Sequence, residues 1–136
     1  MKQQRKDRKE KKMQEILFRG KRLDNGEWII SGSIRQWKNG NVGLMTEYGM
    51  FKVDPETVSQ YTGFTDKNGN KIFGNDILFT VYSEDLQCIQ HVVWYNGGWA
   101  IQQGYFEPDT FHEDTARVAE VIGNFIDNSE LLEEEK

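Results

Sequence analysis

Between residues 15 and 124 apolar and aromatic residues gather in short runs beside Asn-Gly pairs, and this pattern is typical of β-strands joined by hairpin turns. That region shows no long segment with the apolar period of an amphipathic helix. We therefore predict a mainly β protein that is rich in hairpins and has at most short helices. The clearest predicted strands cover residues 15–19, 28–37, 42–46, 77–82, 88–95, 99–103 and 117–124.

Four Asn-Gly pairs mark predicted hairpin turns, at residues 25–26, 39–40, 68–69 and 96–97. Both residue types tolerate the positive φ angles of a type I′ turn, and a two-residue turn fixes the register of the strands that it joins. The predicted cross-strand partners are Leu23 with Trp28, Trp37 with Val42, Ile34 with Met45, Asp66 with Lys71, and Trp94 with Trp99. Because Gly98 follows the last pair, a shifted turn would instead place Trp94 opposite Ile101.

Three short helices are predicted from their end residues. Asp54 and Pro55 have the character of an N-cap and a first helical residue, and a second, polar helix is expected within residues 110–116. Asn128 or Ser129 is expected to cap a final helical turn that frays after Leu132.

Charge divides the chain into a basic arm and an acidic body. Residues 1–14 carry seven Lys or Arg and two acids, a net charge of +5, and the remaining residues carry ten bases and twenty acids, a net charge of −10. The arm has almost no apolar residues, so we expect it to be disordered. It is either a functional arm or an extension upstream of an alternative start at Met13. Its bases are Lys2, Arg5, Lys6, Arg8, Lys9, Lys11 and Lys12.

The predicted organisation has four parts. They are the basic arm (1–14), an N-terminal β subdomain (15–58), a C-terminal β subdomain that is barrel-like or sandwich-like (59–132), and an acidic tail (133–136). One cysteine excludes an internal disulfide, and no apolar run approaches the roughly 20 residues that a membrane helix needs. No apolar segment follows the arm to complete a secretion signal. We therefore expect a cytoplasmic protein with no membrane partner.

Two segments carry a specific pattern: YTGFTDKNGNKIFGNDI over residues 61–77 and VIGNFIDNSELL over residues 121–132. Together they resemble the YopX family of phage and prophage proteins, with its Tyr-Thr-Gly-Leu start, Asp-Lys-Asn-Gly turn, Ile-Tyr-Glu-Gly-Asp-Ile strand entry and closing Ile-Gly-Asn…Asn-Pro-Glu-Leu-Leu. Residues 15–21 (EILFRGK) are similar to the usual start of the family. The resemblance covers residues 13–132 and leaves the basic arm outside.

This chain departs from the family pattern at two places. Gly74-Asn75 stands where the family has Glu-Gly, and Ser129 replaces a proline. Asparagine tolerates positive φ nearly as well as glycine, so the turn is expected to survive. The resemblance implies a mainly β fold of two small parts and a setting in a bacterial host cell. It implies no catalytic residues, because the function of the family is not established.

The residues of these motifs are predicted to define the fold rather than to catalyse a reaction. Their glycines suit positive φ or close backbone approach. Asp66 and Asn68 suit a turn in which side chains bond their own backbone, and Asp76 is expected to accept backbone N–H groups where a strand starts. The whole predicted structural set is Tyr61, Gly63, Asp66, Asn68, Gly69, Asp76, Gly123 and Asn124.

Cys88 and His91 have a spacing found among zinc ligands. Residues three apart in a strand face opposite sides of the sheet, so we predict a buried Cys88 and no metal or cofactor.

A second histidine lies among carboxylates. His112 stands beside Glu113 and Asp114 and near Asp109, a set that suits a general base and is equally typical of a solvated acidic loop. Glu84-Asp85 is predicted to be a hairpin tip.

Aromatic residues make up 12% of the chain and suit either core packing or binding. Trp28, Trp94 and Trp99 lie beside predicted hairpin turns, so we predict that they belong to the core. Tyr105 and Phe106 lie in a loop between Gly104 and Pro108 and are the candidate interface residues.

We predict a non-enzymatic phage or prophage accessory protein that acts by protein–protein binding or self-association. Its partner would be a second copy or an unidentified protein, and exposed strand edges favour such pairing. One alternative is a nucleic-acid-associated small β-barrel whose arm neutralises phosphates, although the acidic body disfavours it. A second alternative is a small hydrolase that uses His91 or His112.

Overall fold

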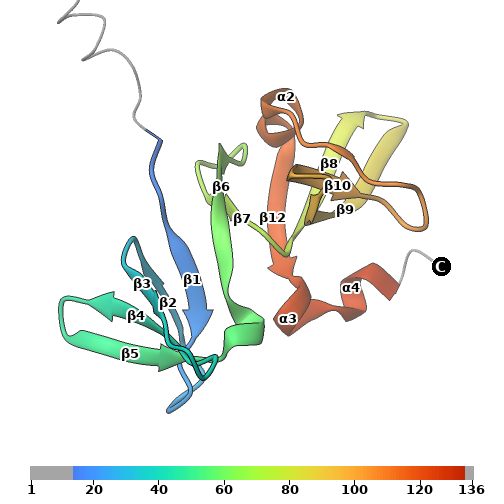
Figure 1. Ribbon diagram of the computed structural model, residues 1–136. Helices are drawn as coiled ribbons and strands as arrows, with labels where there is room; N and C mark the ends of the chain where they lie inside the picture. The colour runs from blue at the N-terminus through green and yellow to red at the C-terminus, as the bar shows by residue number, and fades with distance from the viewer. Residues whose placement is uncertain (1–13, 134–136) are drawn as a thin grey trace, which may run out of the picture.

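The computed structural model describes residues 14–133, and within them the chain forms antiparallel sheets joined by short connections (Figure 1). The sheets have the strand orders β2-β1-β6-β7, β3-β4-β5 and β11-β10-β9-β8-β12. The strands are β1 (Phe18–Lys21), β2 (Trp28–Ser31), β3 (Ile34–Gln36), β4 (Val42–Thr46), β5 (Gly49–Val53), β6 (Ser59–Thr65), β7 (Lys71–Phe73), β8 (Asp76–Ser83), β9 (Leu86–Tyr95), β10 (Gly98–Gln102), β11 (Asp109–Thr110) and β12 (Ala119–Asn124). The mainly β prediction is confirmed, and the predictions for residues 1–13 and 134–136 lie outside the described residues.

The described helical segments are all short, as predicted. They are the 3₁₀ helix η1 (Pro55–Thr57) and the α-helices α2 (Glu113–Arg117), α3 (Phe125–Asn128) and α4 (Glu130–Glu133). Asp54 caps η1 by accepting a hydrogen bond from the Glu56 N–H, which confirms that helix start. No described helix is long and apolar enough to cross a bilayer.

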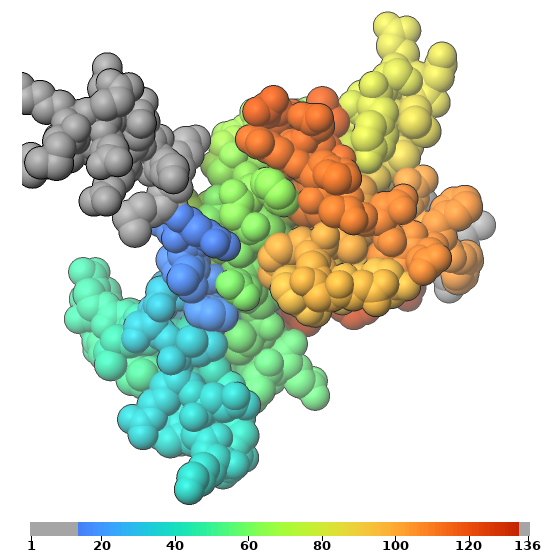
Figure 2. All heavy atoms as spheres, turned by 45° about the horizontal axis from the view of Figure 1, so that its top comes forward, coloured from blue at the N-terminus to red at the C-terminus, as the bar shows by residue number. Residues whose placement is uncertain are grey.

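The N-terminal core lies between the three-stranded sheet and strands β1 and β2. Val42, Leu44 and Val53 are fully or almost fully buried there, and Phe18 and Ile29 pack against them. Each such aliphatic side chain contributes about 1.5–3 kcal/mol through its burial. In Figure 2 the cyan and turquoise segments, which include β2 to β5, project as a lobe from the rest of the molecule.

The single strand predicted over residues 28–37 is wrong, because β2 and β3 are separate strands of different sheets. The chain turns at Gly32 and Ser33, and a Cβ on Gly32 would lie 3.0 Å from the Ile16 carbonyl oxygen. Ser31 Oγ accepts a hydrogen bond from the Ser33 N–H across this corner (2.9 Å). The strand therefore ends at this point for two reasons. Gly32 packs closely against the Ile16 carbonyl before β1, and the Ser31 side chain hydrogen-bonds the backbone of the turn.

Three of the four predicted hairpin registers are wrong. Lys21, not Leu23, lies opposite Trp28, because the first loop closes with Arg22 N–H on the Glu27 carbonyl (2.9 Å). In the next two hairpins the partners are Gln36 with Val42, Ile34 with Leu44, and Thr65 with Lys71.

The two shifted hairpins share one cause. Gly40 (φ 92°) and Gly69 (φ 84°) have positive φ but the preceding asparagines do not, so each loop has three residues and ends in a left-handed glycine. In the fourth hairpin Asn96 (φ 51°) and Gly97 (φ 81°) are both left-handed, so the tight turn forms. The predicted pairing of Trp94 with Trp99 is confirmed there.

The C-terminal core lies on the inner side of the five-stranded sheet, which curls as Figure 1 shows. Its most buried members are Ile72, Leu78, Val92 and Ala119, which are 0% exposed. The predicted hairpin tip at Glu84-Asp85 is confirmed, since Ser83 pairs with Leu86. β1 pairs with β6, so strands from both sides of the boundary predicted near residue 58 share the four-stranded sheet.

Candidate functional site

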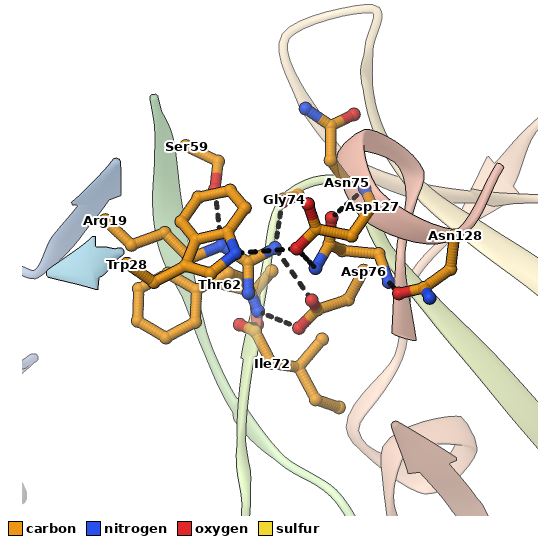
Figure 3. Close-up of polar contacts among 12 residues, drawn as sticks. Arg19, Trp28, Ser59, Thr62, Ile72, Gly74, Asn75, Asp76, Asp127 and Asn128 are labelled. Carbon is orange, nitrogen blue, oxygen red and sulfur yellow. Dashed lines mark hydrogen bonds and ion pairs between the residues drawn. The ribbon is translucent and has the colours of Figure 1, made fainter. Parts of the chain in front are cut away.

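A buried ion pair between β1 and β8 joins the N-terminal strands to the C-terminal sheet (Figure 3). Arg19 Nη2 lies 2.7 Å from Asp76 Oδ1, and the two side chains are 13% and 2% exposed. Arg19 also donates to Ser59 Oγ (3.0 Å) and to the Gly74 carbonyl (3.2 Å), while Asp76 Oδ2 accepts from the Phe73 N–H (2.7 Å). Burial raises the pKa of Asp76, and the charge of Arg19 opposes that rise. The predicted acceptor role of Asp76 is confirmed, but its ionic partner lies 57 residues earlier and was not predicted.

Trp28 extends this junction to α3. Its ring lies 5.0 Å from the Arg19 guanidinium carbon, and its Nε1 donates to Asp127 Oδ2 at 2.7 Å. Lys21 forms an ion pair with the same carboxylate. The hydrogen bond from Lys21 is the main cause that lowers the pKa of Asp127. Trp28 is thus half-buried in a polar junction rather than in either apolar core.

The closing motif folds back on itself beside this junction. Asn124 Oδ1 accepts from the Asp127 N–H (2.9 Å) and caps α3, and Asn128 Oδ1 accepts from the Asn124 N–H (3.1 Å). Asn128 therefore does not serve as the predicted cap of the last turn. A Cβ on Gly123 would lie 2.6 Å from Asn128 Oδ1, which confirms the predicted close approach at that glycine.

Asp66 organises the turn between β6 and β7 and fastens it to β12. Its Oδ1 accepts from the N–H groups of Asn68 and Asn70 (2.9 Å each), and its Oδ2 accepts from the Val121 N–H (3.0 Å). Burial alone would raise the pKa of Asp66, but the hydrogen bonds from Val121, Asn70 and Asn68 outweigh it and lower the pKa. Asp66 therefore has the predicted turn role, but it does not face Lys71.

The other motif residues also support the backbone. Gly63 has φ 93°, as predicted for a glycine that needs positive φ, and Asn75 tolerates φ 71° where the family has glycine. Tyr61 is buried, with its ring centroid 5.7 Å from that of Phe73. These motif residues therefore have structural roles: they shape turns and connect neighbouring strands.

An open hollow of about 410 Å³ lies between the β9–β10 hairpin, the loop after β10, and the α3–α4 segment. It lies on the face of the sheet opposite to the core residue Val92, because successive strand residues alternate faces. Its lining residues are His91, Gln102, Gly104, Tyr105, Phe125, Ser129, Leu132 and Glu133. The hollow thus combines the candidate histidine, a candidate interface aromatic and the closing motif.

His91 presents a flat, neutral ring to this hollow. Its ring stacks on Phe125 with centroids 4.9 Å apart and planes 9° apart, and its Nε2 lies 3.2 Å from Asn75 Oδ1. Burial lowers the pKa of His91, so the imidazole is uncharged near neutral pH. With the amide oxygen of Asn75 as acceptor, the proton lies on Nε2.

Tyr105 stands at the edge of the hollow and is 90% exposed, and its neighbour in the chain, Phe106, is 74% exposed. The loop that carries them is fastened to β9, because the Tyr95 hydroxyl donates to Glu107 Oε1 at 2.8 Å. Tyr105 lines the hollow, and Phe106 lines a separate shallow depression. Their predicted exposure is confirmed, and their use as an interface stays a prediction.

The remaining candidates lie apart from the hollow. Cys88 is buried, as predicted, and His112 is exposed at the start of α2. Within residues 14–133 no group of three His, Cys, Asp or Glu is placed to hold a metal ion. Trp99 packs against the C-terminal core, but the prediction for Trp94 is wrong, because it is 62% exposed. Its partner Trp99 occupies the space above Gly74 and leaves Trp94 outside.

Comparison with known proteins identifies a family and a solved structure with a related fold. A family model described as YopX protein matches residues 5–133. That match begins upstream of Met13, so the prediction that the whole arm lies outside the family pattern is wrong for residues 5–12. The crystal structure of protein EF1440 from Enterococcus faecalis is similar, with a TM-score of 0.55 and 19% identity over 88% of this chain and 99% of that chain. At this identity the likeness concerns the fold alone. No curated protein matches the chain.

Proposed function

The chain belongs to the YopX family, and we propose that it is a non-enzymatic binding protein that self-associates through the hollow beside Tyr105. The observation that carries this proposal is the side chain of Tyr105, which is 90% exposed at the rim of a hollow lined by His91 and Phe125. The next residue in the loop, Phe106, is 74% exposed. Large exposed aromatic groups next to a concave surface are characteristic of protein interfaces. We further propose that it serves as a phage or prophage accessory protein in the bacterial cytoplasm, which rests on the family resemblance.

A second copy is the proposed occupant because the surface offers both halves of a two-fold contact. The loop after β10 supplies the exposed Tyr105, and the hollow beside it supplies a surface lined by Phe125 and Leu132. In a two-fold dimer each copy would insert its aromatic side chain beside the other copy's hollow. Eight residues line the hollow, fewer than the roughly 20–30 per side of a standard stable interface. The proposed dimer is therefore weak and exchanges with monomer.

Sedimentation velocity over a range of protein concentrations tests this proposal. The wild-type sedimentation coefficient is expected to rise with concentration, and the double substitution Y105A/F106A is expected to remove the rise. Tyr48→Ala is the matched control, because Tyr48 is 83% exposed in the turn between β4 and β5. A wild-type protein that stays monomeric, or a Y105A/F106A variant that associates as the wild type does, contradicts the proposal.

A further inference from the structure

The bases of the described chain fall into two groups. Six of the nine Lys and Arg residues in the range 14–133 form ion pairs with carboxylates: Arg19, Lys21, Arg22, Lys67, Lys71 and Arg117. Arg35, Lys38 and Lys52 form no ion pair with any described residue. The three residues without such a pair all belong to the three-stranded sheet or to its β3–β4 turn.

Strand register places two of these bases, Arg35 and Lys52, on one face of the sheet. Arg35 lies directly opposite Gly43, and Gly43 lies directly opposite Lys52, so the two side chains flank this glycine on the same side of the sheet. Two strand spacings separate them, a distance of about 10 Å. Lys38 stands at the exposed β3–β4 turn next to Trp37. The opposite face of the sheet carries the buried Leu44 and belongs to the N-terminal core.

Gly43 gives this face its aromatic component. A Cβ on Gly43 would lie 3.0 Å from Trp37 Cη2 and 2.7 Å from Met50 Sδ. Because glycine has no side chain, the Trp37 indole and the Met50 thioether can pack directly over its backbone. The Arg35 guanidinium carbon lies 5.0 Å from the centre of the Trp37 ring. Trp37 thus holds a planar cation at the surface. We call Arg35, Trp37, Lys38 and Lys52 the basic face.

Local charge at this face opposes the charge of the whole body. Residues 34–53 carry three bases and one acid, a net charge of +2, while the rest of residues 15–136 carries seven bases and nineteen acids, a net charge of −12. At physiological ionic strength charges are screened beyond about 8 Å, so a ligand at this sheet responds mainly to the nearby bases. The acidic body therefore does not by itself prevent an anion from binding here.

We propose that the basic face binds single-stranded nucleic acid without sequence preference. Arg35, Lys38 and Lys52 would contact successive phosphates, and the guanidinium plane of Arg35 would stack on a base. Stacking on a planar cation requires an unpaired base, and a narrow face suits a single strand rather than a duplex. An acidic polypeptide would share the charge complementarity but has no base to stack, so we favour nucleic acid.

Fluorescence anisotropy of a labelled oligonucleotide of about 20 nucleotides, titrated with the full chain between about 50 and 200 mM salt, tests the proposal. The wild type is expected to bind at low salt and to lose affinity steeply as salt rises. The double substitution K38A/K52A is expected to make the slope of log K against log salt shallower by about 1.4, because each phosphate contact in a single strand contributes about 0.7. K67A/K71A is the matched control, since those lysines pair with Glu120 and Glu15, and its slope is expected to equal that of the wild type.

Arg35→Lys separates stacking from charge. It keeps the charge and removes the planar group, so affinity is expected to fall while the salt slope stays unchanged. Circular dichroism spectra confirm that each variant is folded. The proposal is overturned if the wild type fails to bind at low salt, if K67A/K71A lowers the slope as much as K38A/K52A, or if a poly-glutamate peptide of equal charge binds as tightly as the oligonucleotide.

Discussion

Removal of the Arg19 side chain should destabilise the protein more than removal of any exposed base. In the Arg19→Ala variant the Asp76 carboxylate, 2% exposed, loses its ionic partner and keeps the hydrogen bond from the Phe73 N–H. Breaking a buried pair in this way lowers the free energy of unfolding by about 3–5 kcal/mol. The matched control is Arg117→Ala, whose side chain is 68% exposed, so a change below about 1 kcal/mol is expected.

The effect of Arg19→Ala should also depend on pH. Burial already raises the pKa of Asp76 above its ordinary value of 3.8, and without Arg19 that pKa rises further. A carboxyl group whose folded pKa is raised stabilises the fold below its unfolded pKa, and this contribution is lost as pH rises through the folded pKa. The loss of stability in the variant is therefore expected to be smaller in mild acid than at neutral pH.

Urea unfolding of the wild type and both variants at about pH 5 and pH 7 measures these differences. Taking the variant minus the wild type at each pH cancels the contributions of Asp66 and Asp127, whose pKa values are lowered. The reasoning is refuted if Arg19→Ala costs no more than Arg117→Ala, or if its cost is the same at both pH values.

Three further substitutions test other parts of the account. Gly123→Ala places a methyl group 2.6 Å from Asn128 Oδ1 and should lower the free energy of unfolding by about 1–3 kcal/mol in urea titrations. Asp66→Asn should cost about 1–3 kcal/mol at neutral pH, and that cost should disappear as acid protonates the wild-type carboxylate, because a lowered folded pKa stabilises only above it. Trp99→Ala should cost about 3–5 kcal/mol in thermal melts, whereas Trp94→Ala, at a residue that is 62% exposed, should cost below about 1 kcal/mol.

Local sequence signals predicted the features that depend on a few neighbouring residues. The Asn96-Gly97 turn, the Asp54 cap and strand β4 (Val42–Thr46) all follow from short patterns of residue type. The same signals failed at Asn39-Gly40, because an Asn-Gly pair also fits a three-residue loop in which only the glycine is left-handed. Backbone angles, rather than residue identity, decide between those two loops.

Strands β5 and β7, like β6 (Ser59–Thr65) and β11 (Asp109–Thr110), are absent from the predicted strands, and each depends on pairing with its neighbour. β5 (Gly49–Val53) pairs with β4 after a Glu47-Tyr48 turn that carries no glycine or asparagine signal, and β7 (Lys71–Phe73) has only three residues. Both are stable as strands because the adjacent strand is already in place. Short segments of this kind contain too few residues for a hydrophobic periodicity that would predict a strand.

The sites depend on contacts between distant parts of the chain, and sequence alone did not predict them. The Arg19–Asp76 pair joins residues that are 57 positions apart in the sequence. The hollow brings together His91, Tyr105 and Leu132 from three separate segments. The one sequence signal for the basic face was weak: residues 34–53 carry three bases and one acid, while the body as a whole is acidic. The register between strands was needed to place Arg35 and Lys52 on one side of the sheet.

The most direct test of self-association through the Tyr105 hollow is a concentration series of two-dimensional amide NMR spectra of the full chain. The account predicts that the amide signals of Tyr105, Phe106 and Phe125 shift progressively as the concentration rises, because these residues lie at the proposed contact. The signals of the three-stranded sheet, on another part of the molecule, are expected to stay constant. Spectra that do not change with concentration, or shifts confined to the three-stranded sheet, would contradict the account.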